Sequence, residues 1–254
     1  MRQNQLFRFL PGKYTDSAEW LATPRARLFL QYERRVLTQL LPGLTGYRCV
    51  QIGRWGYEHS TLAHAGTLCQ WQLGFGAATR ADIAFDGRHL PLASASVDAL
   101  VLAHALEQVA EPHALLRECA RVLNARGQLV ILAFNPFSLW ALRQGLPTRR
   151  TPRFRPCSAP PSASRLYDWL RLLEFEPERL VRYGLGFPFF GGYHRVGEDR
   201  RSARSIAWCA QAYGLCARRQ VAPHTPIRKT LPGPRKRAAV GLARQASHRV
   251  NCRR

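Results

Sequence analysis

This sequence contains few acidic residues and very few lysines. Its 254 residues include 16 Asp or Glu against 38 Lys or Arg, which gives a formal net charge of +22. The only lysines are Lys13, Lys229 and Lys236, so almost all of the positive charge comes from arginine. Clustered basic side chains bind phosphate backbones, but an arginine bias also arises from GC-rich coding sequence. Both interpretations of the charge stay open.

Long apolar runs are missing as well. No stretch of roughly eighteen apolar residues occurs, so the sequence predicts no transmembrane helix. The start, Met1 to Gln5, lacks the apolar core of a secretory signal. We therefore expect a cytoplasmic protein that does not insert into a membrane.

Paired metal ligands and paired cysteines are also lacking. The seven cysteines are scattered and show no Cys-x-x-Cys spacing, and the eight histidines are dispersed. Three of the cysteines lie within apolar strand or helix patterns, where a thiol behaves as a small hydrophobe. No phosphate-binding P-loop or nucleophile elbow occurs. The sequence predicts neither a disulfide framework nor a metal site.

Short apolar runs organise the segment from residue 47 to residue 134. They cover residues 49–52, 99–103 and 128–134 and are separated by intervals of helical length. Such runs are typical of buried parallel strands joined by crossover helices. The predicted fold class is therefore α/β, in a chain long enough for one domain with appendages.

A further pattern runs from Asp86 to Gly127. Asp86 precedes Leu90-Pro91, and Asp98-Ala99-Leu100-Val101 and His104-Ala105-Leu106-Glu107 follow. This order resembles the class I methyltransferases that use S-adenosylmethionine (SAM), in particular their methyltransferase type 11-like branch. The resemblance covers residues 47–134 and, more loosely, 20–217. It implies SAM as cofactor and a Rossmann-like fold: a mostly parallel seven-stranded sheet with an antiparallel edge strand and helices on both faces.

The turn after the first strand departs from the family pattern. The family has an acid, one further residue and then three glycines at alternate positions, so that the backbone and the next helix can approach the cofactor. Gly53 matches the first glycine, whereas Gln51 replaces the acid and Trp55 and Tyr57 replace the other two glycines. Gly56 is out of register. The resemblance implies cofactor contacts from Gln51, Gly53 and Gly56.

The rest of the cofactor site is partly kept. The second strand, predicted at 67–73, is followed by no acid before Asp82, so the family's ribose anchor is missing. Asp86 occupies the family position that meets the adenine amino group, with Leu90 and Pro91 in the loop beneath the base. The alternative is that Asp86 is a turn residue that bonds its own backbone.

His104 follows the fourth strand, at the carboxyl edge where open α/β sheets bind ligands. We predict that it contacts the cofactor, and as a general base it is the candidate catalytic residue. A structural histidine is the alternative, because many methyl transfers need only alignment of the acceptor. Asp98, at the start of that strand, is predicted to be a structural cap.

Three residues after the fifth strand, Asn135, Phe137 and Trp140, are predicted to form the substrate-side wall of the pocket, with plain packing as the alternative. Asn-Pro-Phe does not represent the Asn/Asp-Pro-Pro-aromatic signature of nucleic-acid amino methyltransferases, because that signature follows the fourth strand. Trp20 either helps to close the pocket or packs the first helix onto the sheet.

The predicted organisation has three parts. Residues 1–46 form a helical entry whose main helix starts at Thr23-Pro24. Residues 47–219 form the methyltransferase-like domain, with an exposed basic loop at 143–161, a helix at 164–173, a sixth strand at 175–181 and a last, antiparallel edge strand at 212–217. Residues 220–254 are expected to be a disordered basic tail.

Three functions remain compatible with these patterns. The first is a SAM-dependent methyltransferase with an unidentified, small-molecule acceptor. The second is a non-catalytic binding protein with the same fold, which the substitutions in the glycine turn favour. The third is a nucleic-acid methyltransferase that uses its basic loop and tail; residues 218–254 contain eleven Arg or Lys and no acid.

Overall fold

The computed structural model describes residues 20–53, 62, 65–75, 81–145, 156–186, 193–194 and 210–220. Trp55, Gly56 and Tyr57 lie outside these residues, and so do most of the basic loop and the tail beyond Gln220. The predictions that concern them stay predictions.

A seven-stranded mixed sheet forms the centre of the described chain. Its strands are β1 (Thr45–Ile52), β2 (Gly66–Phe75), β3 (Ile83–Phe85), β4 (Val97–Ala103), β5 (Leu123–Phe134), β6 (Phe175–Tyr183) and β9 (Ala212–Arg219). They are arranged in the order β3-β2-β1-β4-β5-β9-β6. The pairs from β3 to β5 are parallel, and β9 runs antiparallel to both β5 and β6.

This topology confirms the predicted Rossmann-like methyltransferase fold. The antiparallel strand predicted at 212–217 is β9, and the outermost pair of the sheet, β9 with β6, is antiparallel. However, β9 itself lies one position inside the edge, which β6 forms. Hydrogen-bond partners on both sides explain why β9 is apolar and buried along most of its length.

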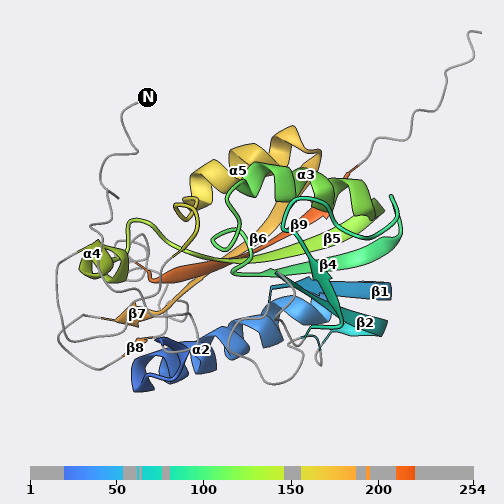
Figure 1. Cartoon of the computed structure of the whole chain (residues 1–254). Helices are drawn as coiled ribbons and strands as arrows, with labels where there is room; N and C mark the ends of the chain where they lie inside the picture. The colour runs from blue at the N-terminus through green and yellow to red at the C-terminus, as the bar shows by residue number, and fades with distance from the viewer. Residues whose placement is uncertain are drawn as a thin grey trace, which may run out of the picture. The chain divides into compact units, whose positions relative to one another are not determined.

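Helices cover both faces of the sheet, as predicted. They are α2 (Pro24–Leu40), the short 3₁₀ helix Leu41–Gly43, α3 (Pro112–Val122), α4 (Leu139–Gly145) and α5 (Ala163–Leu172). Helix α2 lies on one face, while α3 and α5 lie on the other (Figure 1). Alternation along β4 supplies both cores: Leu100 and Leu102 face α3 and α5, and Ala99 and Val101 face α2.

Helix α2 begins where the sequence predicts. The Thr23 hydroxyl accepts a hydrogen bond from the Ala26 amide at 3.3 Å, and Pro24 occupies the first turn. The helix packs closely on β9, because a Cβ at Gly214 would lie 2.8 Å from a Leu40 methyl group. Leu28, which fits the apolar spacing, is 40% exposed, whereas Glu33 lies on the buried side.

The bounds of two further segments follow from the structure. Strand β5 begins at Leu123, directly after α3, so residues 124–127 extend the strand ahead of the apolar run 128–134. The short strands β7 (Leu185–Gly186) and β8 (Tyr193–His194) pair antiparallel.

Asp98 lies at the amino end of β4, away from the carboxyl edge of the sheet. Its Oδ2 accepts hydrogen bonds from the Tyr47 and Arg48 amides at 2.8 and 2.9 Å, and its Oδ1 accepts one from the Asn124 side chain. The carboxylate therefore ties β1 to β4 and to the start of β5, which is a structural function.

Candidate functional site

The carboxyl ends of β1 and β4 meet at the centre of the sheet. Ile52 pairs with Leu102, so Gly53 lies beside the end of β4. Gly53 has φ +89°, and a Cβ there would lie 2.7 Å from the Ala103 carbonyl oxygen. A side chain at this position would have to displace the neighbouring backbone. The first glycine of the family pattern thus meets a real steric requirement.

Two amide side chains brace this junction. The buried Gln51 donates a hydrogen bond from Nε2 to the Gly53 carbonyl at 3.0 Å. Gln108 donates from Nε2 to the His104 carbonyl, also at 3.0 Å. Gln51 therefore organises the turn after β1 as an amide, where the family pattern has a carboxylate.

Next to this junction lies a buried charge cluster formed by Glu33 of α2, His104 and Glu107. His104 Nε2 is 3.2 Å from Glu33 Oε1, and His104 Nδ1 is 3.4 Å from Glu107 Oε1. All three side chains are fully buried. Glu107 Oε1 also accepts a hydrogen bond of 2.6 Å from the Phe134 amide, which links the cluster to the end of β5.

Two opposing effects determine the protonation of His104. Burial lowers its pKa, but the charge of Glu33 and the hydrogen bonds and charges of both carboxylates outweigh burial and raise it to about 9. At neutral pH the ring is therefore an imidazolium and has no lone pair with which to accept a proton. The role of His104 as a general base stays a prediction, and the geometry favours a positioning role.

The backbone at His104 supports this interpretation. The residue has φ +50°, a conformation that costs a non-glycine residue free energy. Its amide donates to the Leu132 carbonyl at 3.1 Å, and its carbonyl accepts from Gln108. The ion pairs with Glu33 and Glu107 offset that cost and fix the turn at the end of β4.

Asp86, the candidate adenine contact, is part of a local turn. Its Oδ1 accepts hydrogen bonds from the His89 and Arg88 amides at 3.0 and 2.8 Å, and these two bonds lower the pKa of the exposed carboxyl group. The turn interpretation therefore holds. It leaves an ionised carboxylate at the surface, so an additional adenine contact stays a prediction.

Leu90, which was predicted beside the adenine, points into the core on the α3 side. Its amide donates to Glu118 Oε2 at 3.0 Å, and Arg121 donates to the Leu90 carbonyl at 3.0 Å. The loop that carries Asp86 is thus fastened to α3.

Asp82, the first acid after β2, accepts a hydrogen bond of 2.8 Å from the Gln72 amide. That bond ties it to the backbone of β2.

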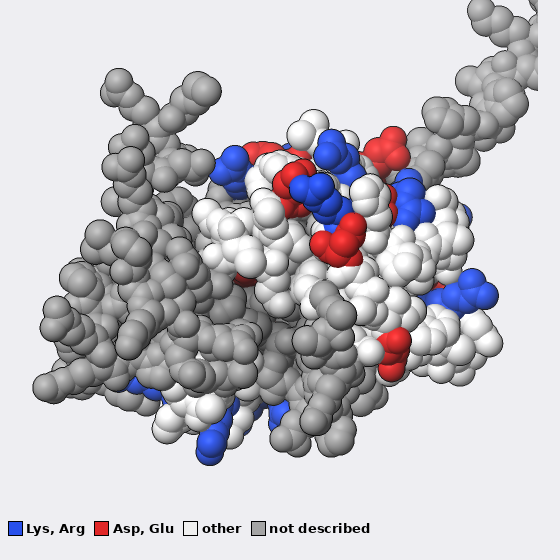
Figure 2. Space-filling view, viewed as in Figure 1, with Lys and Arg blue, Asp and Glu red and all other residues white. Residues whose placement is uncertain are grey.

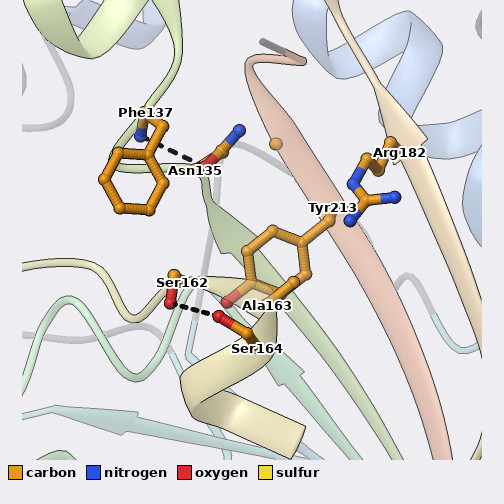
Figure 3. Close-up of a pocket in the computed structure, with 8 residues that line it drawn as sticks. Asn135, Phe137, Ser162, Ala163, Ser164, Arg182 and Tyr213 are labelled. Carbon is orange, nitrogen blue, oxygen red and sulfur yellow. Dashed lines mark hydrogen bonds between the residues drawn. The ribbon is translucent and has the colours of Figure 1, made fainter. Parts of the chain in front are cut away.

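A small pocket of about 130 Å³ lies farther along the carboxyl edge (Figure 3). It is bounded by the end of β5, the start of α5, the end of β6 and the start of β9. Its lining residues are Asn135, Phe137, Ser162, Ala163, Ser164, Arg182, Ala212 and Tyr213. Two of the three residues predicted for the substrate-side wall, Asn135 and Phe137, are among them.

Trp140, the third predicted residue, does not line this pocket. It stacks on Phe134, with ring centroids 4.6 Å apart, and contacts Trp20 edge-on at 5.8 Å. Trp20 is only 5% exposed and also contacts Phe29. This aromatic cluster lies on the α2 face, which supports the packing interpretation of Trp20.

The sequence analysis missed several residues that the fold brings to these sites. Glu33 carried a usable signal, since it is the acid on the otherwise apolar stripe of α2 that includes Phe29 and Val36. Arg182 and Tyr213 carried none, because they come together only through the pairing of β6 with β9.

Metal binding and membrane insertion have no support in the described part of the chain. No group of three His, Cys, Asp or Glu side chains there is arranged to hold a metal ion. No helix in that part is long and apolar enough to span a bilayer.

Burial raises the pKa of the Cys49 thiol to about 12 and that of Cys216 to about 11, so these thiols are packing groups.

Charges of both signs are intermixed on the face that carries α3 and α5 (Figure 2). Arg121, for example, pairs with Glu118 at 2.8 Å, and Arg88 lies 3.8 Å from Glu111. The described residues on this face therefore form no uniformly basic surface. The basic loop and tail, to which the sequence assigned nucleic-acid binding, lie largely outside the described residues.

Comparison with known proteins points to one family. A family model described as a methyltransferase domain matches residues 69–131. The chain is 33% identical over 236 residues to the uncharacterized protein YafS of Escherichia coli (strain K12), an alignment that covers 89% of this chain and 91% of YafS.

Solved structures show the same fold at low sequence identity. A chain in the complex of the Haloferax volcanii Trm112 methyltransferase activator with a putative methyltransferase matches with a TM-score of 0.52 and 15% identity, covering 83% of this chain and all of that one. A SAM-dependent methyltransferase from Thermotoga maritima, described as a possible histamine N-methyltransferase, matches with a TM-score of 0.51 and 17% identity, covering 77% and 94%.

Proposed function

This chain belongs to the same family as YafS, residues 69–131 match a methyltransferase-domain model, and the fold is that of the class I SAM-dependent methyltransferases. We propose that it is an enzyme that transfers a methyl group from SAM to a small-molecule acceptor. The T. maritima protein of the same fold is described as a possible methyltransferase of a small amine, which supports an acceptor of that size.

The observation that carries the proposal is the glycine at the junction of β1 and β4. Gly53 keeps a positive φ and a position that no side chain can occupy without moving the Ala103 carbonyl. The carboxyl edge of a parallel sheet is where open α/β folds bind nucleotides. The chain has lost the acid of the family turn, but Gln51 now bonds the Gly53 carbonyl and so organises the same turn.

We assign residues to both ends of the cofactor. At the methionine end we assign Gln51 and Gly53, with Gly56 as the further contact that the sequence predicts. At the adenine end we assign Asp86, whose carboxylate the Arg88 and His89 amides keep ionised, on the loop anchored by Leu90. When bound, SAM supplies an activated methyl group on a sulfonium.

The residues of the chain then contribute to methyl transfer by positioning the acceptor. His104 is held as an imidazolium between Glu33 and Glu107, so the role that we assign to it is to fix the β4 turn. An acceptor whose attacking atom needs no base at neutral pH suits this arrangement. Alignment of such an atom with the methyl group supplies the rate enhancement.

Isothermal titration with SAM and with S-adenosylhomocysteine tests the proposal. We expect saturable binding of both, and Asp86→Ala is expected to weaken it by about tenfold through loss of a charged hydrogen bond. Asp168→Ala, which removes an exposed acid from α5, is the matched control and leaves binding unchanged. No heat and no thermal shift at millimolar cofactor would reject the enzyme and leave the non-catalytic binding protein.

A further inference from the structure

The pocket between β5, α5, β6 and β9 has a distinct chemical character. Its one charged lining residue is Arg182, and none of the described residues that line it is an acid. Two serine hydroxyls, Ser162 and Ser164, lie at the start of α5, where the helix dipole adds positive potential. The lining is therefore suited to a negatively charged group.

Strand pairing accounts for the direction of Arg182. Arg182 lies directly opposite Tyr213 in the antiparallel pair of β6 and β9, so both side chains are on the same face of the sheet. Tyr213 belongs to the core on the α3 and α5 side. Figure 3 shows Arg182 on one side of the Tyr213 ring and Asn135 and Phe137 on the other.

Several polar groups of the pocket are already used within the protein. Tyr213 donates its hydroxyl proton to the Pro161 carbonyl at 2.7 Å. Asn135 donates from Nδ2 to the Ala210 carbonyl at 2.9 Å and accepts from the Phe137 amide at 3.2 Å. These two residues shape the pocket and do not select its ligand.

Donors for a ligand come from Arg182 and the two serines. The Ser162 and Ser164 hydroxyls lie 3.1 Å apart, and Ser162 Oγ also accepts from the Arg165 amide at 3.3 Å. One hydroxyl proton is needed for the bond between the serines, which leaves the other for a ligand. No ion pair of Arg182 occurs among the described residues, so its five guanidinium donors suit a carboxylate or phosphate.

Glu107, a carboxylate that acts on the pocket residue Tyr213, is itself paired. Burial, and after it the charge of Glu107, raises the pKa of Tyr213, so this carboxylate acts on the Tyr213 hydroxyl. However, Glu107 is paired with His104 and with the Phe134 amide. It therefore does not cancel the field of Arg182.

We propose that this pocket binds the carboxylate or phosphate end of the methyl acceptor. At about 130 Å³ it is smaller than a complete small-molecule site and holds one end group. It lies on the same carboxyl edge as Gly53 and His104, so the rest of the acceptor extends along that edge towards the methyl group. The inference rests on the proposed function for the identity of the ligand as an acceptor, but anion binding itself needs no cofactor.

Titration of the cofactor-free full chain with benzoate, phenyl phosphate and benzylamine, followed by amide chemical shifts in ¹⁵N NMR spectra, tests the proposal. We expect saturable shifts at Ser164, Phe137 and Tyr213 with the two anions and none with the cation. The stronger of the two anions identifies the end group as carboxylate or phosphate. Absence of saturable shifts with both anions overturns the proposal.

Two variants make the test specific. Arg182→Gln is expected to weaken binding of the better anion about tenfold or more, because a charge-assisted hydrogen bond is lost, and Arg182→Lys is expected to restore part of it. Arg179→Gln is the matched control: it removes the same charge from β6, but that side chain bonds the Gln39 carbonyl at the end of α2. If Arg179→Gln and Arg182→Gln weaken anion binding equally, the anion does not bind in this pocket and the proposal is overturned.

Cofactor titration separates the two proposals. Arg182→Gln is expected to bind S-adenosylhomocysteine as the unmodified chain does. If no form of the chain binds S-adenosylhomocysteine while Arg182-dependent anion binding persists, the methyltransferase proposal fails and the anion site stands. A competition experiment adds a short single-stranded RNA to the complex with phenyl phosphate, at equal phosphate concentration. If the RNA displaces phenyl phosphate, the ligand of the pocket is a nucleic acid and the small-molecule acceptor assignment is overturned.

Discussion

At the β1–β4 end of the carboxyl edge, two carboxylates enclose an imidazolium without exposed surface, whereas at the β5–β6 end an arginine and two serines line a cavity. The charged groups of the first region are paired with one another, whereas the second region has a single charged lining residue, Arg182, with no ion pair among the described residues. Our proposals assign the cofactor to the first end of the edge and an anionic group of the acceptor to the second. The contrast shows that one sheet edge can keep one set of charged side chains paired and buried while another charged side chain lines a cavity.

The largest expected effect comes from breaking the buried charge cluster. Glu33→Gln removes one carboxylate from a fully buried ion pair and is expected to lower the free energy of unfolding by about 3 kcal/mol. Urea unfolding at pH 7 measures it. Arg34→Gln, on the exposed side of the same helix, is the control, with a change of less than about 0.5 kcal/mol. If the two variants are equally stable, the cluster does not stabilise the fold.

The pH dependence of stability also tests the buried charge cluster. The pKa of His104 is raised from 6.5 in the unfolded chain to about 9 in the folded one. Its contribution is therefore complete below pH 6.5 and is lost as the pH rises through 9, by up to about 3 kcal/mol. Unfolding of the unmodified chain and of His104→Gln from pH 6 to pH 10 measures the difference. A ring that titrates near 6.5 by NMR would contradict the cluster.

Gly53→Ala tests the junction that the cofactor is proposed to approach. A methyl group there meets the Ala103 carbonyl at 2.7 Å in a backbone conformation that alanine rarely adopts. We expect a loss of about 2 kcal/mol in unfolding free energy and loss of S-adenosylhomocysteine binding. Gly43→Ala, where no atom lies within 4 Å of the new methyl group, is the control. Normal cofactor binding in the Gly53 variant would contradict the assignment.

Tyr213→Phe has the smallest expected effect and probes the pocket side. It removes only the hydrogen bond to the Pro161 carbonyl, so the unfolding free energy is expected to fall by about 1 kcal/mol. Anion binding stays within about twofold, because the hydroxyl is not a ligand donor in this pocket. A loss of anion binding as large as that of Arg182→Gln would place the tyrosine among the ligand contacts.

The α/β sheet was predictable because its signals are local. Apolar runs at 49–52, 99–103 and 128–134 form the carboxyl-terminal parts of β1, β4 and β5, and Thr23-Pro24 begins α2 as a capping pair does. Asp98 and Asp86 also took the structural turn and cap roles that their positions favour. Which strand forms the outer edge of the sheet was less predictable, because apolar composition does not tell whether a strand has one neighbouring strand or two.

The candidate site was predictable only in part. Gly53, His104 and Asn135 were found because each follows a recognisable strand, and strand ends define the carboxyl edge. The partners that decide their chemistry were not found. His104 looked like a base until Glu33, from a helix 71 positions earlier in the chain, turned out to lie 3.2 Å from its ring.

The sequence by itself determined the order of strands and helices, the lost acid and glycines of the first turn, and the excess of arginine, since these follow from residue type and spacing along the chain. Only the tertiary structure decided the charge state of His104 and the grouping of Arg182 with Ser162 and Tyr213. The physical reason is that protonation and ligand selectivity depend on burial and on distances of a few ångströms between groups far apart in sequence. Folding alone sets those distances.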